Sequence, residues 1–146
     1  MGFTPEGLEI NPQMADRARR LGFRVMQGRI EDIDRAPGEP RFDAVTLCDV
    51  LEHIPTPLST LRKLRSWMVS GGTLLIRGPL NNDPMTWVKE SARRLVGATK
   101  QLRGYPLDAN VFNPKSLSIM LSQAGFMVPE WRGQTKGFGN AISRAV

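Results

Sequence analysis

Residues 48–55 hold the densest group of side chains that could do chemistry, because they include Asp49, Glu52 and the chain's only histidine, His53. They directly follow the apolar run 44–48, which is typical of a buried strand. In an open α/β sheet, ligands bind outside the carboxyl ends of the strands, so this turn is expected to face a cleft. Imidazole is the side chain whose ordinary pKa lies nearest neutrality, so His53 is the candidate that could take a proton from a nucleophile.

Two other interpretations of the same turn remain open. Two carboxylates and an imidazole can also hold a divalent metal ion. The turn has neither a second histidine nor a further acid, so we predict no metal site there. Alternatively, His53 only caps the turn or bonds to the backbone, and then it has no chemical role.

Two earlier loops carry residues suited to a nucleoside ligand. Glu9 lies at the end of the first predicted strand, where a carboxylate can accept hydrogen bonds from both hydroxyls of a ribose. Gly28 follows the second predicted strand and would let the backbone approach a flat ring, with the residues up to Asp32 framing an adenine. The plainer interpretations are a solvated acid at Glu9 and an ordinary turn at Gly28.

Short apolar runs bounded by turn residues predict the strands that position these loops. They cover residues 6–10, 24–27, 42–48, 73–77, 126–131 and 137–143. Helix starts alternate with them, each a capping side chain followed by proline. They are Asn11-Pro12, Thr56-Pro57, Asp83-Pro84 and Asn113-Pro114. This order predicts an α/β layer fold with right-handed crossovers and helices on both sides of the sheet.

Further patterns refine the expected fold. The run at residues 44–48 does not alternate apolar with polar residues, which is typical of a parallel strand covered on both faces. No helix fits between the last two strands, so they are predicted to pair antiparallel or else to lie apart. Apolar residues repeat on one face of each predicted helix, and the shortest such stripe is Met14, Ala18 and Leu21.

Length and composition limit the class of protein. With 146 residues and 40% hydrophobic content, the chain is expected to form a single domain over residues 1–146. No apolar run approaches the roughly 18 residues of a membrane helix, and the N-terminus lacks a signal-peptide pattern. The single cysteine, Cys48, supports neither a disulfide framework nor a zinc finger. We therefore expect a cytoplasmic protein with no membrane contact.

The formal net charge of +6 raises the question of an anionic partner. The basic residues cluster on three predicted helices, a distribution that is typical of solvated helix faces. We therefore expect no nucleic acid partner. Binding of a nucleic acid stays the weaker alternative, and it predicts a steep dependence of affinity on salt.

Taken in order, these segments resemble class I S-adenosylmethionine-dependent methyltransferases of the broad group of ubiquinone-biosynthesis and sugar-modifying enzymes. The resemblance rests on residues 7–12, 27–32, 42–57, 64–76, 112–117 and 124–126. It implies a Rossmann-like fold with a mostly parallel sheet, S-adenosylmethionine as the cofactor, and methyl transfer to a small-molecule acceptor, with His53 as a candidate base. The cofactor contacts that it implies are Glu9, Ile10, Gly28, Arg29, Ile30, Cys48, Asp49 and Val50. In some relatives, the turn that residues 49–53 resemble binds magnesium.

The chain also departs from this family. Family members begin with a strand that runs into a Gly-x-Gly-x-Gly loop around the cofactor's methionine part, and residues 1–146 contain no such loop. We therefore expect a truncated domain whose N-terminal β-α unit is missing. Arg29 stands where an acid commonly binds the adenine amine, so Glu31 or Asp32 would replace that acid. Leu107 and Asp108 stand where some relatives carry histidines.

The absent strand supports two further hypotheses. An unpaired strand edge invites pairing with another chain, so a homodimer or strand exchange is predicted. The chain could then be a catalytically inactive methyltransferase remnant that serves as a binding or dimerisation module. A nucleic-acid methyltransferase is the weaker alternative, suggested by the basic helices.

Acceptor choice is expected to rest on residues 80–110. The apolar residues of this segment either form a lid over the acceptor or simply bury one face of a helix. They are Met85, Trp87, Val88, Leu95 and Val96.

Overall fold

The computed structural model describes residues 2–36, 39, 41–80, 110–127, 129–135 and 138–146. The chain divides into two compact units, Met1–Glu39 and Pro40–Val146. Each is described by itself below, as the first unit and the second unit. The helix predicted from Asp83 and the apolar residues of the predicted lid lie outside the described residues.

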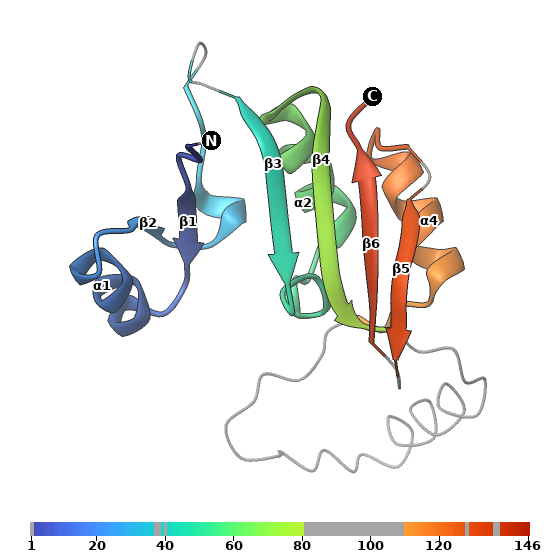
Figure 1. Cartoon of the computed structure of the whole chain (residues 1–146), viewed down its shortest axis with the longest axis horizontal. Helices are drawn as coiled ribbons and strands as arrows, with labels where there is room; N and C mark the ends of the chain where they lie inside the picture. The colour runs from blue at the N-terminus through green and yellow to red at the C-terminus, as the bar shows by residue number, and fades with distance from the viewer. Residues whose placement is uncertain (1, 37–38, 40, 81–109, 128, 136–137) are drawn as a thin grey trace. The chain divides into compact units, whose positions relative to one another are not determined.

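The first unit is a parallel pair of strands joined by a helix (Figure 1). Its elements are β1 (Glu6–Glu9), α1 (Pro12–Arg20), β2 (Arg24–Gln27) and the 3₁₀ turn η1 (Ile30–Asp32). The two strands pair in register, so that Glu9 lies opposite Gln27. The carboxyl ends of both strands therefore meet at the same edge, as the sequence predicts.

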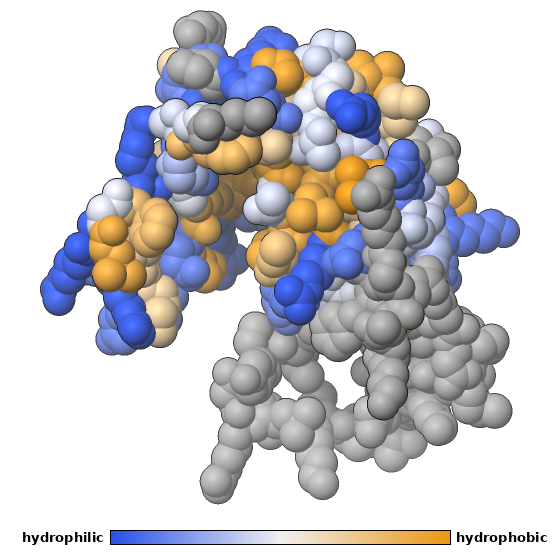
Figure 2. All heavy atoms as spheres, in the orientation of Figure 1, coloured by the Kyte–Doolittle hydropathy of each residue, from blue (hydrophilic) through white to orange (hydrophobic). Residues whose placement is uncertain are grey.

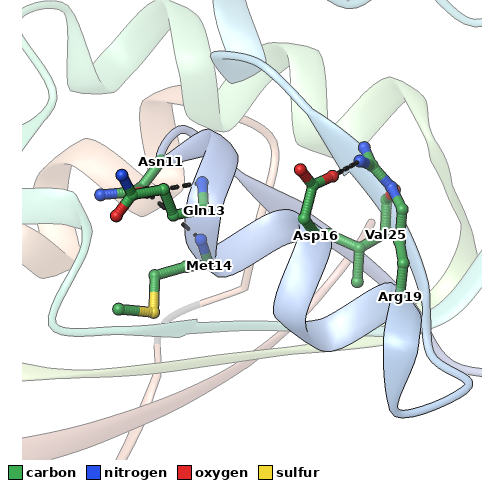
Figure 3. A network of polar contacts seen from close by, with 6 residues as sticks. All are labelled: Asn11, Gln13, Met14, Asp16, Arg19 and Val25. Atoms are coloured by element: carbon green, nitrogen blue, oxygen red, sulfur yellow. Dashed lines mark hydrogen bonds and ion pairs between the residues drawn. The ribbon is translucent and has the colours of Figure 1, made fainter.

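Polar contacts fix α1 at its start and near its end (Figure 3). The Oδ1 atom of Asn11 accepts hydrogen bonds from the backbone N–H groups of Gln13 at 2.9 Å and Met14 at 3.2 Å. This is the predicted N-cap, and it satisfies two of the donors that a helix start leaves unpaired. In the last turn, Nε of Arg19 donates to the carbonyl of Val25 at 2.8 Å and joins the helix to β2.

Apolar burial in the first unit is small. Among its described residues only Ala15 is a buried hydrophobic residue, at 0% exposure. The apolar stripe on α1 is largely exposed, since Met14 is 51% exposed and Leu21, which follows the helix, is 69% exposed. Two strands of four residues offer too little surface to cover the apolar side of a helix.

The second unit is a four-stranded sheet with helices (Figure 1). Its elements are β3 (Phe42–Cys48), the 3₁₀ turn η2 (Leu51–His53), α2 (Pro57–Ser66), β4 (Met68–Pro79), α4 (Pro114–Gln123), β5 (Glu130–Thr135) and β6 (Phe138–Arg144). The strand order is β3-β4-β6-β5. β3 and β4 are parallel, whereas β6 is antiparallel to both of its neighbours, which confirms the predicted antiparallel pairing of the last two strands.

The core of the second unit lies between its sheet and the helices α2 and α4, which lie behind the sheet in Figure 1. The buried residues come from one side of each element, since side chains alternate across a strand and repeat every three to four residues on a helix. They include Leu61 and Leu64 of α2, Leu117 and Leu121 of α4, Leu74 and Ile76 of β4, and Ala141 of β6. The predicted inward faces of both helices are confirmed at these positions.

The opposite face of β3 is open. Ala44, Thr46 and Cys48 alternate with the inward residues and are exposed, and Figure 2 shows hydrophobic surface in the middle of the face over β3 and β4. The expectation that this strand is covered on both faces is therefore not met in the described part of the chain. Within the second unit β3 is an edge strand of the sheet. The described helices α2 and α4 pack on the face of the sheet opposite to this open one.

Of the strands that differ from their predicted bounds, β4 and β5 differ most, whereas β1 and β6 differ by at most one residue at each end. β4 begins at Met68 rather than at residue 73, because Met68 already pairs with Phe42 before a bulge shifts the register. β5 covers Glu130–Thr135 rather than residues 126–131, and Phe126 forms only an isolated bridge with Ala145. No helix in the described residues has the length and apolar character needed to span a membrane.

Candidate functional site

The carboxyl end of the first unit brings Glu9 and Gly28 together. The backbone N–H of Gly28 donates to the carbonyl of Glu9 at 3.0 Å, directly after the last strand pair. The side chain of Glu9 is half-buried, and its Oε1 accepts the N–H of Asn11 at 2.8 Å. A carboxylate held in this way keeps its second oxygen and further lone pairs for a ligand, since an ionised carboxyl offers about four acceptor positions.

Gly28 supplies the predicted open backbone. Its φ is +151°, and a Cβ built there would meet nothing closer than Ile33 at 3.8 Å. A ring could therefore approach this backbone without displacing a side chain of the first unit. Ile30 is half-buried in η1, whereas Ile10 and Arg29 are exposed.

In the second unit, Cys48, Asp49 and Val50 lie at the carboxyl end of β3 and are all exposed. Asp49 has a φ of +53°, a left-handed conformation that aspartate adopts more readily than most residues. Its backbone N–H donates to the carbonyl of Arg77 at 2.8 Å, which ties the turn to the end of β4. The end of β3 is thus held firmly while its side chains stay accessible.

The two titratable side chains of the turn η2 differ in burial. Glu52 is 4% exposed, and its carboxylate lies so close to Gly78 of β4 that a Cβ there would come within 3.3 Å of Oε2. His53 is half-buried, and its Nδ1 is fully buried. Burial of Nδ1 closes that ring nitrogen to a ligand from solvent. Asp49, Glu52 and His53 were expected to face one cleft. Glu52 does not meet this expectation, because its side chain is buried.

Asn110, for which the sequence predicts no role, holds this turn. The backbone N–H of Asn110 donates to the carbonyl of Glu52 at 2.9 Å, and its side-chain Nδ2 donates to the carbonyl of Ile54 at 2.5 Å. Asn110 therefore binds the residues on both sides of His53. Its one sequence signal is its place just before the predicted last helix, which by itself indicates no contact with a turn so far back in the chain.

The described residues gather no three His, Cys, Asp or Glu side chains that could hold a metal ion. A cavity of about 10 Å³ lies beside Glu52, Gly78, Phe112 and Trp131. That volume is the space of a single water molecule, so this cavity is too small for a methyl acceptor.

Comparison with known proteins places the chain in a family. A family model described as a methyltransferase domain matches residues 1–130. The chain belongs to this methyltransferase family. The predicted family and its S-adenosylmethionine cofactor are therefore confirmed, whereas none of the predicted cofactor and catalytic contacts is tested by this match.

Curated relatives of this methyltransferase chain carry the name ubiquinone biosynthesis O-methyltransferase. The protein from Xanthomonas campestris pv. campestris (strain B100) is 27% identical over 157 residues, which cover 93% of the chain and 62% of the relative. That from Marinobacter nauticus is 30% identical over 114 residues, with 75% of the chain and 46% of the relative covered. The chain thus spans about 62% of the length of the Xanthomonas relative.

Solved structures confirm the predicted Rossmann-like methyltransferase fold. A Thermotoga maritima S-adenosylmethionine-dependent methyltransferase, titled a possible histamine N-methyltransferase, matches with a TM-score of 0.69 and 18% identity, covering 97% of this chain and 72% of that one. Human N-acetylserotonin methyltransferase, solved with S-adenosylmethionine, gives a TM-score of 0.67 and 17% identity, covering 96% of this chain and 40% of the human one.

Proposed function

We propose that this chain catalyses transfer of a methyl group from S-adenosylmethionine to a small-molecule acceptor. The observation that carries the proposal is the fixed carboxylate of Glu9 beside the open backbone of Gly28, in a chain of the methyltransferase family. A carboxylate and a bare backbone edge at the ends of two parallel strands suit the ribose and base of a nucleoside.

The first unit would hold the nucleoside part of the cofactor. Glu9 accepts hydrogen bonds from the ribose hydroxyls, with its orientation already set by the N–H of Asn11. Gly28 lets the adenine lie against the backbone, and Ile30 offers an apolar contact beside it. Arg29 is exposed and, as a cation, cannot accept a hydrogen bond from the adenine amine.

The second unit, taken by itself, carries the candidate base and a second group of candidate cofactor contacts. When bound, S-adenosylmethionine supplies an electrophilic methyl group on a sulfonium. Cys48, Asp49 and Val50 present an accessible edge at the end of β3 that can bind the cofactor. His53, with Nδ1 buried, would take the acceptor's proton on Nε2, which is the acceptor atom of the tautomer protonated at Nδ1.

The relatives' names suggest which acceptor atom to test first. Those named ubiquinone biosynthesis O-methyltransferase methylate oxygen by that name, so we propose a small hydroxyl-bearing acceptor. Such a hydroxyl must lose its proton as it attacks the methyl group, and His53 would accept that proton as a general base. His53→Gln is expected to lower kcat by about 100-fold, because general base catalysis commonly contributes that much.

Calorimetric titration with S-adenosylmethionine and its demethylated product tests the cofactor site. Wild-type chain is expected to bind both, and Glu9→Gln to bind them about 10- to 100-fold more weakly, because one or more bonds to a charged acceptor are lost. Asp16→Asn is the matched control. Asp16 is an exposed carboxylate of the same unit that pairs with Arg19 at 2.7 Å, so its variant should bind as wild type does.

Absence of heat with wild-type chain at millimolar ligand would contradict methyl transfer by this chain and favour the hypothesis of an inactive remnant. Equal affinity of Glu9→Gln and wild type would contradict the role of Glu9 alone. The two results therefore separate the function from its residue assignment.

A further inference from the structure

We propose that Asn110 is a positioning residue for proton transfer by His53. It holds in place residues 51–54, the turn η2 and the residue after it, which we call the His53 turn. The inference deepens the proposed function and rests on it for its catalytic part. It concerns only the second unit.

The hydrogen bonds of Asn110 are placed on either side of His53. Its backbone N–H binds the carbonyl of Glu52 at 2.9 Å, and its Nδ2 binds the carbonyl of Ile54 at 2.5 Å. A single residue thus fixes the carbonyls of the residue before His53 and of the residue after it. A short 3₁₀ turn has poorer hydrogen-bond geometry than an α-helix, so contacts from outside matter more for its orientation.

Asn110 is itself anchored. Two residues later, Phe112 is 6% exposed and pairs in a parallel bridge with Leu80, which follows β4. Asn113 then caps α4, with its Oδ1 accepting the N–H of Ser116 at 2.8 Å. The segment that contains Asn110 is therefore fixed to the sheet through Phe112 and to α4 through Asn113. The hydrogen bonds of Asn110 thus connect the His53 turn to both elements.

The other side of the turn is held by the side chain of Glu52. Its carboxylate packs against Gly78, where a Cβ would approach Oε2 to 3.3 Å and Oε1 to 3.6 Å. Glu52 therefore fixes the turn toward β4, and Asn110 fixes its two carbonyls. With Glu52 directed into the interior, His53 is the titratable side chain of η2 left to act on a ligand.

A nuclear magnetic resonance measurement tests the positioning directly. His53 is the only histidine of the chain, so one imidazole Cε1–H signal reports its surroundings. Asn110→Ala removes the bond to Ile54 and keeps the backbone bond to Glu52. Asn110→Asp keeps the size of the side chain and replaces the donor with an acceptor that faces a carbonyl. Both variants are expected to shift or broaden the His53 signal.

Val111→Ala is the matched control, because Val111 is the next residue and is 51% exposed. It should leave the His53 signal unchanged. Thermal unfolding of each variant shows whether the fold persists, and Asn110→Asp serves if Asn110→Ala does not fold. A His53 signal identical to wild type in a folded Asn110 variant would overturn the proposal, whatever the activity.

Kinetics test the catalytic part. Asn110→Ala is expected to lower kcat about tenfold, since loss of one positioning hydrogen bond raises the barrier by about the energy of that bond, with KM for S-adenosylmethionine within about twofold of wild type. In the His53→Gln background the same change should have no further effect on kcat. A tenfold loss that persists without His53 would overturn positioning through His53. An unchanged kcat in His53→Gln alone would instead overturn its role as a base, while the signal of His53 still decides whether Asn110 positions it.

Discussion

The first unit and the second unit hold their candidate site residues by different means. In the first, Glu9 and Gly28 are placed by hydrogen bonds, and Ala15 is the one buried hydrophobic residue that the structure describes there. In the second, the His53 turn rests on a sheet packed against α2 and α4, with Leu51 and Ile54 beside it buried. The positions of the candidate residues in the first unit therefore depend on local polar geometry, and those in the second unit depend on the core.

The largest expected contrast comes from truncating a leucine in each unit. Leu74 of β4 is fully buried, so Leu74→Ala should destabilise the second unit by about 2–5 kcal/mol. Leu8 of β1 is 37% exposed, and Leu8→Ala should cost under about 1 kcal/mol. All three tryptophans lie within residues 40–146, so tryptophan fluorescence in urea follows the second unit, and hydrogen exchange follows the first. Equal losses of stability in the two variants would contradict the difference in core packing between the two units.

Adding a methyl group at a glycine in each unit should give a smaller contrast. At Gly72 a Cβ would come within 3.0 Å of the Val69 carbonyl and 3.2 Å of the Asp43 carbonyl, and neither backbone can easily move. At Gly7 the nearest atom is Cγ2 of Val25 at 3.3 Å, which can rotate away. Gly72→Ala should cost about 1–3 kcal/mol and Gly7→Ala markedly less, by the same two measurements.

The smallest effects should come from the helix caps, and here the two units should agree. Asn11 and Asn113 both accept backbone N–H bonds at the start of their helices, so replacement of either by alanine should cost about 1 kcal/mol. Thr56 makes no capping bond with its side chain, so Thr56→Ala is the control and should cost under about 0.5 kcal/mol. Hydrogen exchange of the first-turn amides measures all three. A much larger cost at Asn113 would show that core packing changes cap energetics.

Much of the local structure was predictable from the sequence. The strands at residues 24–27 and 42–48 match their predicted bounds, and the helices after Asn11, Thr56 and Asn113 begin at the predicted prolines. Turn residues, caps and apolar periodicity act over a few positions, so they can be read along the chain. The predicted homodimer and the single-domain organisation stay predictions.

The candidate site was predictable in position and only partly in geometry. The positions of Glu9, Gly28 and His53 follow from the rule that functional loops lie at the carboxyl ends of strands. The inward turn of Glu52 was not predictable, because it depends on the absence of a side chain at Gly78, on another strand. The role of Asn110 was not predictable either, because it depends on a hydrogen bond to Ile54, 56 residues earlier in the chain.

The sequence by itself determined the family, the order of strands and helices, and which loops carry acids, a glycine and the histidine. The tertiary structure alone decided that Glu52 is buried while His53 stays half-exposed, and that Asn110 binds a carbonyl 56 residues earlier in the chain. Local propensities act between neighbours in sequence, whereas these contacts exist only after β3, β4 and α4 have packed and brought distant backbone groups within hydrogen-bond distance.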